Sequence, residues 1–362
     1  MAEEPSSIEF WTHARTLPRM VGPAARQAEA EGWSGATLGD SQNMSGDPYV
    51  ALGTAIAATR TIRLATGVTN PCTRHPAVTA AGILCANIES GGRVELGAGR
   101  GDSALAHIGL APVSVDALRR FLEVERRYLT GRGVPISEVA EGSSRRIGSD
   151  LPLGHAPEES RMLWLEELRQ LGVEVPERPV PIWVAATGPK VIEVSAELCD
   201  RVTFALGADP GRLRWAVDMA RAVRPEVALG AYVIVVVEED LDRALALTRG
   251  GIATFARFSA MHGRVHGTLE EGDEKVILEV PKAYDMNRHA RSGPQGDVIT
   301  REFAERFAII GPASRCVERL QELVELGITR FHVGGASRGE DPEMTDVINR
   351  RFLDEVLPRV AG

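Results

Sequence analysis

The chain lacks several features that would assign it to a large class of proteins. No apolar run approaches the ~18 residues that a membrane-spanning helix needs. The four cysteines show no spacing typical of a metal or redox site; they are Cys72, Cys85, Cys199 and Cys316. Residues 1–9 are acidic and lack the basic start and the apolar core of a signal peptide. These absences predict a cytoplasmic protein whose cysteines are reduced and packed as small apolar side chains.

Positive charge is also scarce. The sequence has 41 Lys and Arg against 50 Asp and Glu, which gives a net charge of −9 at pH 7. Nucleic acids and anionic membrane surfaces attract clustered positive charge, so this balance predicts neither as a partner. Apolar residues make up 44% of the chain and charged residues 25%, as in an ordinary globular protein with a large core.

Short apolar runs alternate with amphipathic stretches along the chain. Eight runs predict strands, at 7–11, 35–38, 62–68, 94–98, 181–186, 201–206, 229–237 and 330–333. The stretches between them predict helices, at 23–31, 48–59, 76–89, 116–129, 189–198, 241–258 and 312–326. This alternation predicts an α/β fold, a single (β/α)8 TIM barrel over residues 1–362. The alternative is a doubly wound open sheet, which needs a glycine turn after the first strand; residues 11–14 contain no glycine.

Two long stretches interrupt the alternation and predict insertions into the barrel. Residues 131–171 are rich in Gly, Ser, Pro and Arg and end in an extra helix at 158–171. Residues 259–299 form a second stretch without sustained periodicity, far longer than the ~2–6 residues of an ordinary connection. Long loops over a barrel mouth typically act as lids. We therefore expect part of 259–299 to cover the pocket, with His262 and Arg288 as substrate contacts.

The loops that follow the predicted strands contain the candidate functional residues, because a (β/α)8 barrel builds its active site there. They offer small residues, amides, hydroxyls and one arginine, at 11–13, 40–42, 68–70, 100–103, 186–190 and 334–335. They show no metal-ligand spacing, no nucleophile elbow and no P-loop. Such groups suit a flat polar heterocycle or a phosphate, and they leave the chemistry to an organic cofactor.

Two of these loops allow two interpretations each. Thr187-Gly188-Pro189-Lys190 opens a helix, where free N–H groups attract an anion, but the same residues also make an ordinary helix cap. Arg100 lies between two glycines, where its guanidinium is suited to a phosphate or, equally, to an exposed turn.

Several segments together resemble the bacterial luciferase-like monooxygenase superfamily, and especially the branch resembling methylenetetrahydromethanopterin reductase. The segments are GVTNP with TRHP at 67–76, SGGR leading to LGAGRGDS at 90–103, AATGPK at 185–190, IGP with CVERL at 310–320, and Gly327-Ile328. The resemblance implies a TIM barrel that binds reduced FMN or the deazaflavin coenzyme F420.

The resemblance also implies roles for individual residues. Asp40 would lie close to the ring system, Gly67-Val68 would form a cis peptide that supports the ring, and Asn70 would reach the ring's polar edge. The remaining cofactor contacts would come from two strand ends, at Arg100, Gly101, Ala186, Thr187, Gly188 and Lys190. The candidate catalytic residues are His13, Asp40 and His262, and no metal is implied.

One departure from the family pattern separates the possible reactions. Several F420 enzymes of this superfamily have a histidine after the acid at the end of the second strand, but here that residue is Ser41. We therefore expect a two-component monooxygenase, in which FMN reduced by a separate flavin reductase reacts with O2 and oxidises a small organic substrate. The alternatives are an F420-dependent reductase or dehydrogenase that needs no oxygen, and a flavin-binding protein without turnover.

The helices at 48–59 and 76–89 predict a homodimer. Both are rich in apolar and small residues, and exposing two such faces on a free monomer is unfavourable. The alternative is that these residues are simply the inner faces of the helices against the barrel.

Overall fold

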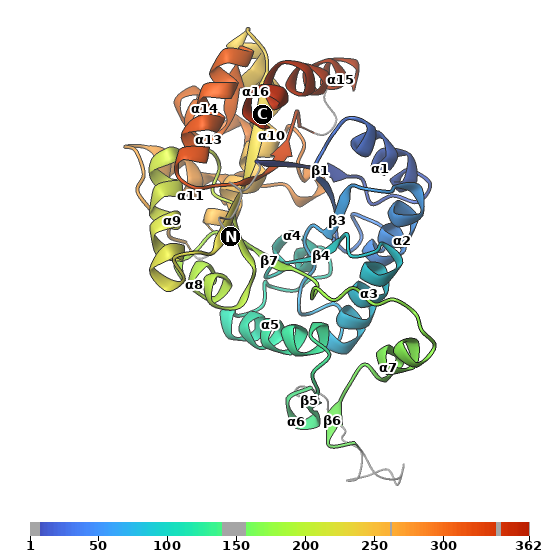
Figure 1. Ribbon diagram of the computed structural model, residues 1–362. Helices are drawn as coiled ribbons and strands as arrows, with labels where there is room; N and C mark the ends of the chain where they lie inside the picture. The colour runs from blue at the N-terminus through green and yellow to red at the C-terminus, as the bar shows by residue number, and fades with distance from the viewer. Residues whose placement is uncertain (1–7, 140–156, 261–262, 338–341, 362) are drawn as a thin grey trace.

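Eight parallel strands close into a barrel, and helices surround it (Figure 1). The structure is a computed structural model that describes residues 8–139, 157–260, 263–337 and 342–361. The barrel strands, in their order around the barrel, are β1 (Glu9–Ala14), β2 (Gly35–Leu38), β3 (Arg63–Thr66), β4 (Val94–Ala98), β7 (Ile182–Ala186), β8 (Arg201–Phe204), β9 (Ala228–Val237) and β11 (Arg330–Gly334). Strand β11 pairs with β1 and completes the circle, which confirms the predicted (β/α)8 fold.

The helices that cover the barrel lie close to the predicted positions. They are α1 (Val21–Ala30), α2 (Pro48–Ala58), α3 (Pro76–Glu89), α5 (Val115–Leu129), α8 (Pro189–Leu198), α9 (Pro210–Val223) and α14 (Ala313–Glu325), with α15 (Pro342–Arg351), a π-helical turn (Phe352–Val356) and α16 (Leu357–Ala361) at the C-terminus. Local caps explain why several begin where the sequence predicts. Asp47 accepts N–H groups of the first turn of α2, and Pro48 occupies its first position. The sequence analysis did not identify α9.

Large and small side chains alternate inside the barrel. The ring of Trp11 lies 2.4 Å from the position of a Cβ on Gly35, and Trp183 lies equally close to that position on Gly97. Only glycine fits opposite either ring, so the two tryptophans fill the barrel axis. His332 joins them, with its ring centroid 4.8 Å from that of Trp183. These buried rings pack against one another inside the barrel.

The first insertion projects from the barrel next to α3 and α5 (Figure 1). It contains a short antiparallel pair, β5 (Val134–Pro135) with β6 (Glu159–Ser160), and the helices α6 (Ile136–Val139) and α7 (Leu163–Gln170). Helix α7 is shorter than the helix predicted for 158–171, because the start of that stretch pairs as β6. Residues 140–156 lie outside the described part of the chain.

The second insertion is more regular than the sequence suggested. Residues 259–299 contain α11 (Asp273–Ala283), a 3-10 turn (Met286–Arg288) and α12 (Pro294–Asp297), so the expectation of an irregular segment is wrong. The apolar residues of α11 pack against α10 (Leu241–Ser259) over only three turns, which is too short for a clear periodicity. Helix α13 (Arg301–Phe307) and strand β10 (Ile309–Gly311) follow, and β10 pairs with the end of β9.

Helix α10 brings the insertion to the carboxyl end of the barrel. Near its C-terminus, Phe255 packs on Tyr232 of β9 with ring centroids 5.4 Å apart, and Tyr232 in turn stacks on His332. Next to it, Gly251 donates its N–H to Ser337, which follows β11. The second half of α10 therefore covers part of the barrel mouth.

Candidate cofactor site at the carboxyl end of the barrel

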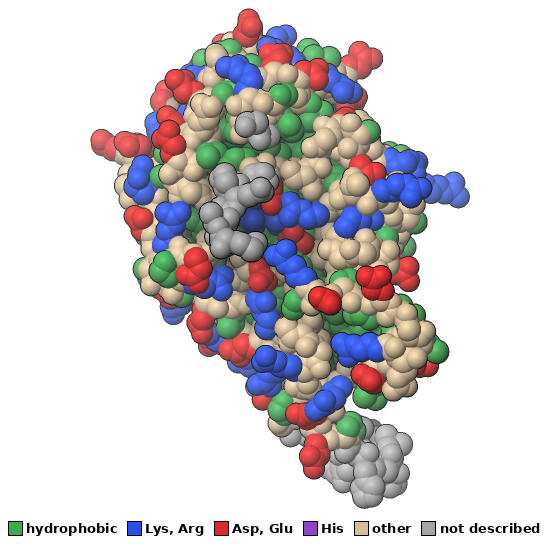
Figure 2. Space-filling view, viewed as in Figure 1, with side chains coloured by type: hydrophobic (Ala, Val, Ile, Leu, Met, Phe, Trp, Pro, Cys, Tyr) green, Lys and Arg blue, Asp and Glu red, His purple; other side chains and the backbone are tan. Residues whose placement is uncertain are grey.

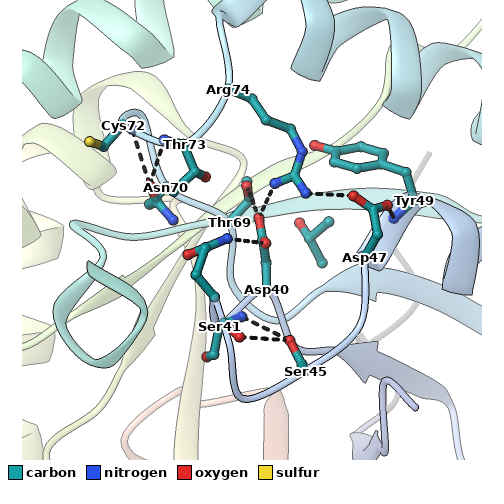
Figure 3. A network of polar contacts seen from close by, with 12 residues as sticks. Asp40, Ser41, Ser45, Asp47, Tyr49, Thr69, Asn70, Cys72, Thr73 and Arg74 are labelled. Atoms are coloured by element: carbon teal, nitrogen blue, oxygen red, sulfur yellow. Dashed lines mark hydrogen bonds and ion pairs between the residues drawn. The ribbon is translucent and has the colours of Figure 1, made fainter. Parts of the chain in front are cut away.

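Asp40, at the end of β2, is the centre of a buried polar network (Figure 3). Its carboxylate accepts hydrogen bonds from Thr69 Oγ1 at 2.7 Å and from Gln42 Nε2 at 2.7 Å. It also forms an ion pair with Arg74, whose Nη1 lies 2.6 Å from Oδ2. A buried charge is tolerated when it is paired and hydrogen-bonded, and Asp40 meets both conditions.

Arg74 links Asp40 to the surrounding helices. Its second terminal nitrogen, Nη2, lies 2.8 Å from the carboxylate of Asp47, the residue that caps α2. Its guanidinium also lies 4.9 Å above the ring of Tyr49, an arrangement typical of a cation–π contact. Arg74 is thus fixed on three sides, and it in turn fixes the orientation of Asp40. The sequence analysis used Arg74 only as part of a motif and missed this function.

The segment that follows β3 has the geometry that the resemblance implied. The peptide bond between Gly67 and Val68 is cis. Gly67 packs against Thr37, where a Cβ would lie 2.4 Å from a side-chain carbon, and Val68 lies against Gly99 at the end of β4. The expectation of a cis peptide at Gly67-Val68 is therefore confirmed.

Asn70 presents a free donor to the mouth. Its Oδ1 accepts the N–H groups of Cys72 and Thr73, which fixes the side chain in a turn. Its Nδ2 is buried and has no hydrogen-bond partner among the described residues. A Cβ on Gly101 would lie 2.9 Å from that of Asn70, so this residue also borders the loop after β4. A buried donor without a partner is costly, and a bound polar molecule would satisfy it.

The two loops predicted to bind phosphate follow neighbouring strands. Strand β4 pairs with β7, so Arg100 and Thr187 lie at adjacent strand ends. Gly188 is the N-cap of α8 and has open space around the position of a Cβ, while Lys190 is exposed in the first turn. Burial lowers the pKa of Arg100, and its Nε donates to the carbonyl of Val113. Ala186 ends β7 and is buried.

The histidines proposed as catalytic residues have different positions. His13 is the last residue but one of β1; its side chain is exposed, and its Nδ1 lies 3.1 Å from Thr37 Oγ1. His262 lies outside the described residues. Arg288, predicted as a substrate contact, is exposed, and its carbonyl accepts from Gln295 Nε2.

Sequence analysis also missed an ion pair that joins α10 to the mouth. Arg257 Nη2 lies 3.2 Å from Asp102 Oδ1 and donates to Ser103 Oγ at 3.0 Å. The guanidinium lies 4.5 Å from the ring centroid of Tyr284, next to α11. Burial raises the pKa of Asp102, with Arg257 opposing it. Asp102 and Arg257 are distant in sequence, so no local pattern indicates that they pair. The sequence indicated only that the polar residues after β4 belong to the mouth.

The donor set of the mouth fits a flavin-type cofactor. Asn70 offers a free buried N–H, the start of α8 and Arg100 offer positive potential, and the glycines after β4 leave space that side chains would fill. Among the described residues, no group of three or more His, Cys, Asp or Glu side chains is arranged to hold a metal ion. Within the same part of the chain, no helix has the length and apolar character of a membrane span.

The structure is a (β/α)8 barrel with a polar mouth. Comparison with known protein families identifies the family to which this barrel belongs. The family model described as luciferase-like monooxygenase matches residues 9–330. The chain belongs to this family, as the resemblance implied.

Individual relatives narrow the comparison. The chain is 25% identical to 5,10-methylenetetrahydromethanopterin reductase of Methanopyrus kandleri, over 99% of each sequence. It is 26% identical to an F420-dependent glucose-6-phosphate dehydrogenase of Beutenbergia cavernae, over 85% of this chain and 81% of that sequence. The solved structure of coenzyme F420 dependent tetrahydromethanopterin reductase from Methanopyrus kandleri superposes with a TM-score of 0.68 at 21% identity, covering 98% of this chain and 100% of the other.

These comparisons correct one expectation. The sequence analysis favoured a monooxygenase because Ser41 replaces a histidine found in several F420 enzymes. The relatives are instead reductases and a dehydrogenase, so this preference is wrong, and the expected O2 and flavin reductase partners are withdrawn with it. The protein is an oxidoreductase of the luciferase-like family. Ser41 alone was too narrow a basis for choosing the reaction. The other motifs of the mouth resemble those of the monooxygenases and of the F420-dependent enzymes alike.

Proposed function

We propose that the protein is an F420-dependent reductase or dehydrogenase that transfers a hydride between the deazaflavin and a small organic substrate. The observation that carries this proposal is the mouth itself, where a buried unpartnered amide and two phosphate-suited loops converge in a chain related to F420-dependent enzymes. Coenzyme F420, when bound, supplies the hydride chemistry.

The residues of the chain bind and orient the cofactor in this proposal. Asn70 Nδ2 would donate to the polar edge of the ring, and Val68 would pack against the ring. Arg100 and the N–H groups at the start of α8 bind the phosphate, because the positive end of a helix and a guanidinium both favour an anion. Asp40 is fully paired by Thr69, Gln42 and Arg74, so it orients the wall of the pocket.

The substrate binds on the side of the mouth where the second half of α10 lies. Phe255 and Tyr232 provide an aromatic wall, and Arg257 with Asp102 provides a charged one. His13 is exposed on β1, where an imidazole is able to exchange a proton with a reacting oxygen or nitrogen. These walls favour a compact polar or aromatic substrate and exclude bulk water from the reacting atoms.

Anaerobic turnover tests the proposal. Reduced F420 is mixed with the protein and a panel of small aldehydes, ketones, imines and enoyl compounds in the absence of oxygen. We expect at least one compound to be reduced with one equivalent of F420 oxidised. Oxidation of F420 that occurs with oxygen alone, and yields hydrogen peroxide, would contradict a hydride-transfer function.

A further inference from the structure

A second cavity lies at the amino end of the barrel, opposite the end that carries Asp40. Its volume is about 320 Å³, and it is lined by the first residues of β1, β3, β7, β8, β9 and β11. The loop of residues 176–181, which leads into β7, forms another wall. The packed rings of Trp11, Trp183 and His332 lie between this cavity and the mouth.

Positive charge is in excess around this cavity. Five arginines line it against three carboxylates: Arg63, Arg93, Arg178, Arg201 and Arg330 against Glu9, Glu95 and Asp200. The excess contrasts with the net charge of −9 for the whole chain. In Figure 2, basic side chains gather near the centre of the face shown. A concave, partly buried surface of one sign concentrates ions of the opposite sign.

All three carboxylates are paired, two of them with arginines of the same cavity. Arg330 donates to Glu9 at 2.6 Å and to both oxygens of Glu95. Arg63 shares Glu9, at 2.8 Å. Burial alone would raise the pKa of Glu9, but Arg330 and Arg63 lower it to about 2. Asp200 faces another cation, because its Oδ2 lies 3.2 Å from Arg126.

The positive charges of Arg201 and Arg178 are less completely paired with carboxylates. Arg201 Nη1 donates to the carbonyl of Leu229 and to Thr329 Oγ1, and the nearest carboxylate with which Arg201 pairs, that of Glu9, lies 4.0 Å away. Burial and the adjacent Arg330 lower the pKa of Arg201 to about 10. Arg178 is exposed at the rim and forms no ion pair with any residue that the structure describes.

A neutral donor in the lining is also without a partner. Trp183 lines the cavity, and its Nε1 is buried with no acceptor among the described residues. An anion with several oxygens in this cavity would add acceptors next to Arg201 and Arg178.

We propose that the cavity at the amino end of the barrel binds a small polyanion, a phosphate ester or a di- or tricarboxylate, through Arg201 and Arg178. The volume is at the small end of the range for ligand pockets, which limits the ligand to a compact molecule. This site is separate from the cofactor phosphate site, and it does not depend on the proposed reaction.

Isothermal titration calorimetry at low ionic strength tests the proposal with two probes, pyrophosphate and citrate. We expect at least one to bind with a stoichiometry near one per chain, and the tighter probe distinguishes a phosphate ligand from a carboxylate ligand. Arg178→Gln and Arg201→Gln should each weaken binding, by about tenfold for the buried arginine, the range of a lost charge-assisted hydrogen bond.

Two control variants separate this cavity from other sources of binding. Arg169→Gln removes an equal charge from α7, so it should not change the affinity for the probe by more than about twofold. Arg100→Ala weakens the phosphate site that we propose at the mouth, so any binding that this variant loses belongs to the mouth and not to this cavity. Arg178→Glu gives a second test if Arg201→Gln does not fold, since reversing a rim charge should abolish binding. The proposal is overturned if neither probe binds, if the Arg178 variants bind as the unmodified protein does, or if Arg100→Ala removes the binding.

Discussion

Two polar side chains of the barrel mouth differ sharply in how their hydrogen bonds are satisfied. The carboxylate of Asp40 receives donors from Thr69, Gln42 and Arg74. Asn70 uses its oxygen in a turn and leaves its amide nitrogen buried and free. A side chain whose hydrogen bonds are all made within the protein supports the pocket, whereas a buried donor without a partner is available to a bound ligand. Asn70 is therefore the side chain that we expect to contact the cofactor ring directly.

Asn70→Asp tests this difference with almost no change in shape. The substitution keeps the oxygen that accepts the N–H groups of Cys72 and Thr73 but replaces the free donor with an acceptor. We expect cofactor affinity to fall by on the order of tenfold or more, with a small change in melting temperature. Fluorescence titration measures the first and thermal unfolding the second. An unchanged dissociation constant would show that Asn70 does not contact the ring.

Arg100→Ala tests the phosphate site. Loss of a hydrogen bond to a charged group costs about 1.5–3 kcal/mol, so the dissociation constant of the cofactor should rise by roughly one to two orders of magnitude. Arg119→Ala is the matched control, because Arg119 pairs with Glu197 on the outer surface. Equal effects of the two substitutions would remove Arg100 from the site.

Some residues of the barrel mouth can be identified from the sequence, and others cannot. The structure places Asp40, the cis peptide at Gly67-Val68 and Asn70 next to strand ends at the barrel mouth, and their contacts with a cofactor stay predictions. The resemblance pointed to all three. It gives no indication of the pairs that Arg74 and Arg257 form. Those pairs depend on how helices and loops pack across the mouth, which no local pattern encodes.

Among the secondary-structure elements, α10 connects residues 259–299 to the barrel mouth. Arg257 and Phe255 of its last turns contact the mouth, whereas Arg243 in its first turn pairs with Glu238 at the far end. Arg257→Gln should raise KM or change substrate preference while cofactor affinity stays within about twofold. Steady-state kinetics with two substrates measures this, and Arg243→Gln is the control. If both variants keep the original specificity, α10 does not contact the substrate.

Helix α5 carries a buried carboxyl group with a marked effect on stability. Glu125 is fully buried, and neither of its oxygens has a hydrogen-bond partner among the described residues, so burial raises its pKa well above 4.5. The folded chain therefore retains this proton at a pH where the unfolded chain loses it. Raising the pH through that interval lowers the free energy of unfolding, by up to about 1.4 kcal/mol per pH unit.

Glu125→Gln should remove this pH dependence. Relative to the unmodified protein, the variant should gain stability between about pH 5 and pH 8, by on the order of 1–3 kcal/mol. Urea unfolding at several pH values measures the difference, and Glu123→Gln on the same helix is the exposed control. A difference that is constant with pH would show that Glu125 is ionised in the fold.

Prediction of whole elements succeeds where the signal is local. Caps such as Asp47 with Pro48 define helix starts, and alternating apolar runs define the barrel strands. Strand β10 and α11 were missed because β10 has three residues and α11 pairs with α10 only in the folded chain. Tertiary packing decides both.

At the scale of the whole molecule, α2 and α3 suggest how two copies associate. Val50 on α2 is 72% exposed and Val78 on α3 is 59% exposed, so an association through these helices would remove apolar surface from water. A homodimer that buries both stays our prediction. Light scattering should give about twice the chain mass of 39.0 kDa, and Val50→Glu with Val78→Glu should give the monomer mass. A monomer at micromolar concentration in the unmodified protein would contradict the prediction.

A paired titration with oxidised F420 and FMN tests the central claim most directly. Both cofactors are added separately to the unmodified protein and to the Asn70→Asp variant, and binding is followed by fluorescence. We predict saturable binding of F420 at micromolar concentration, at least tenfold weaker binding of FMN, and a loss of F420 affinity in the variant. Tight binding of FMN with no binding of F420 would contradict the assignment of this protein as an F420-dependent oxidoreductase.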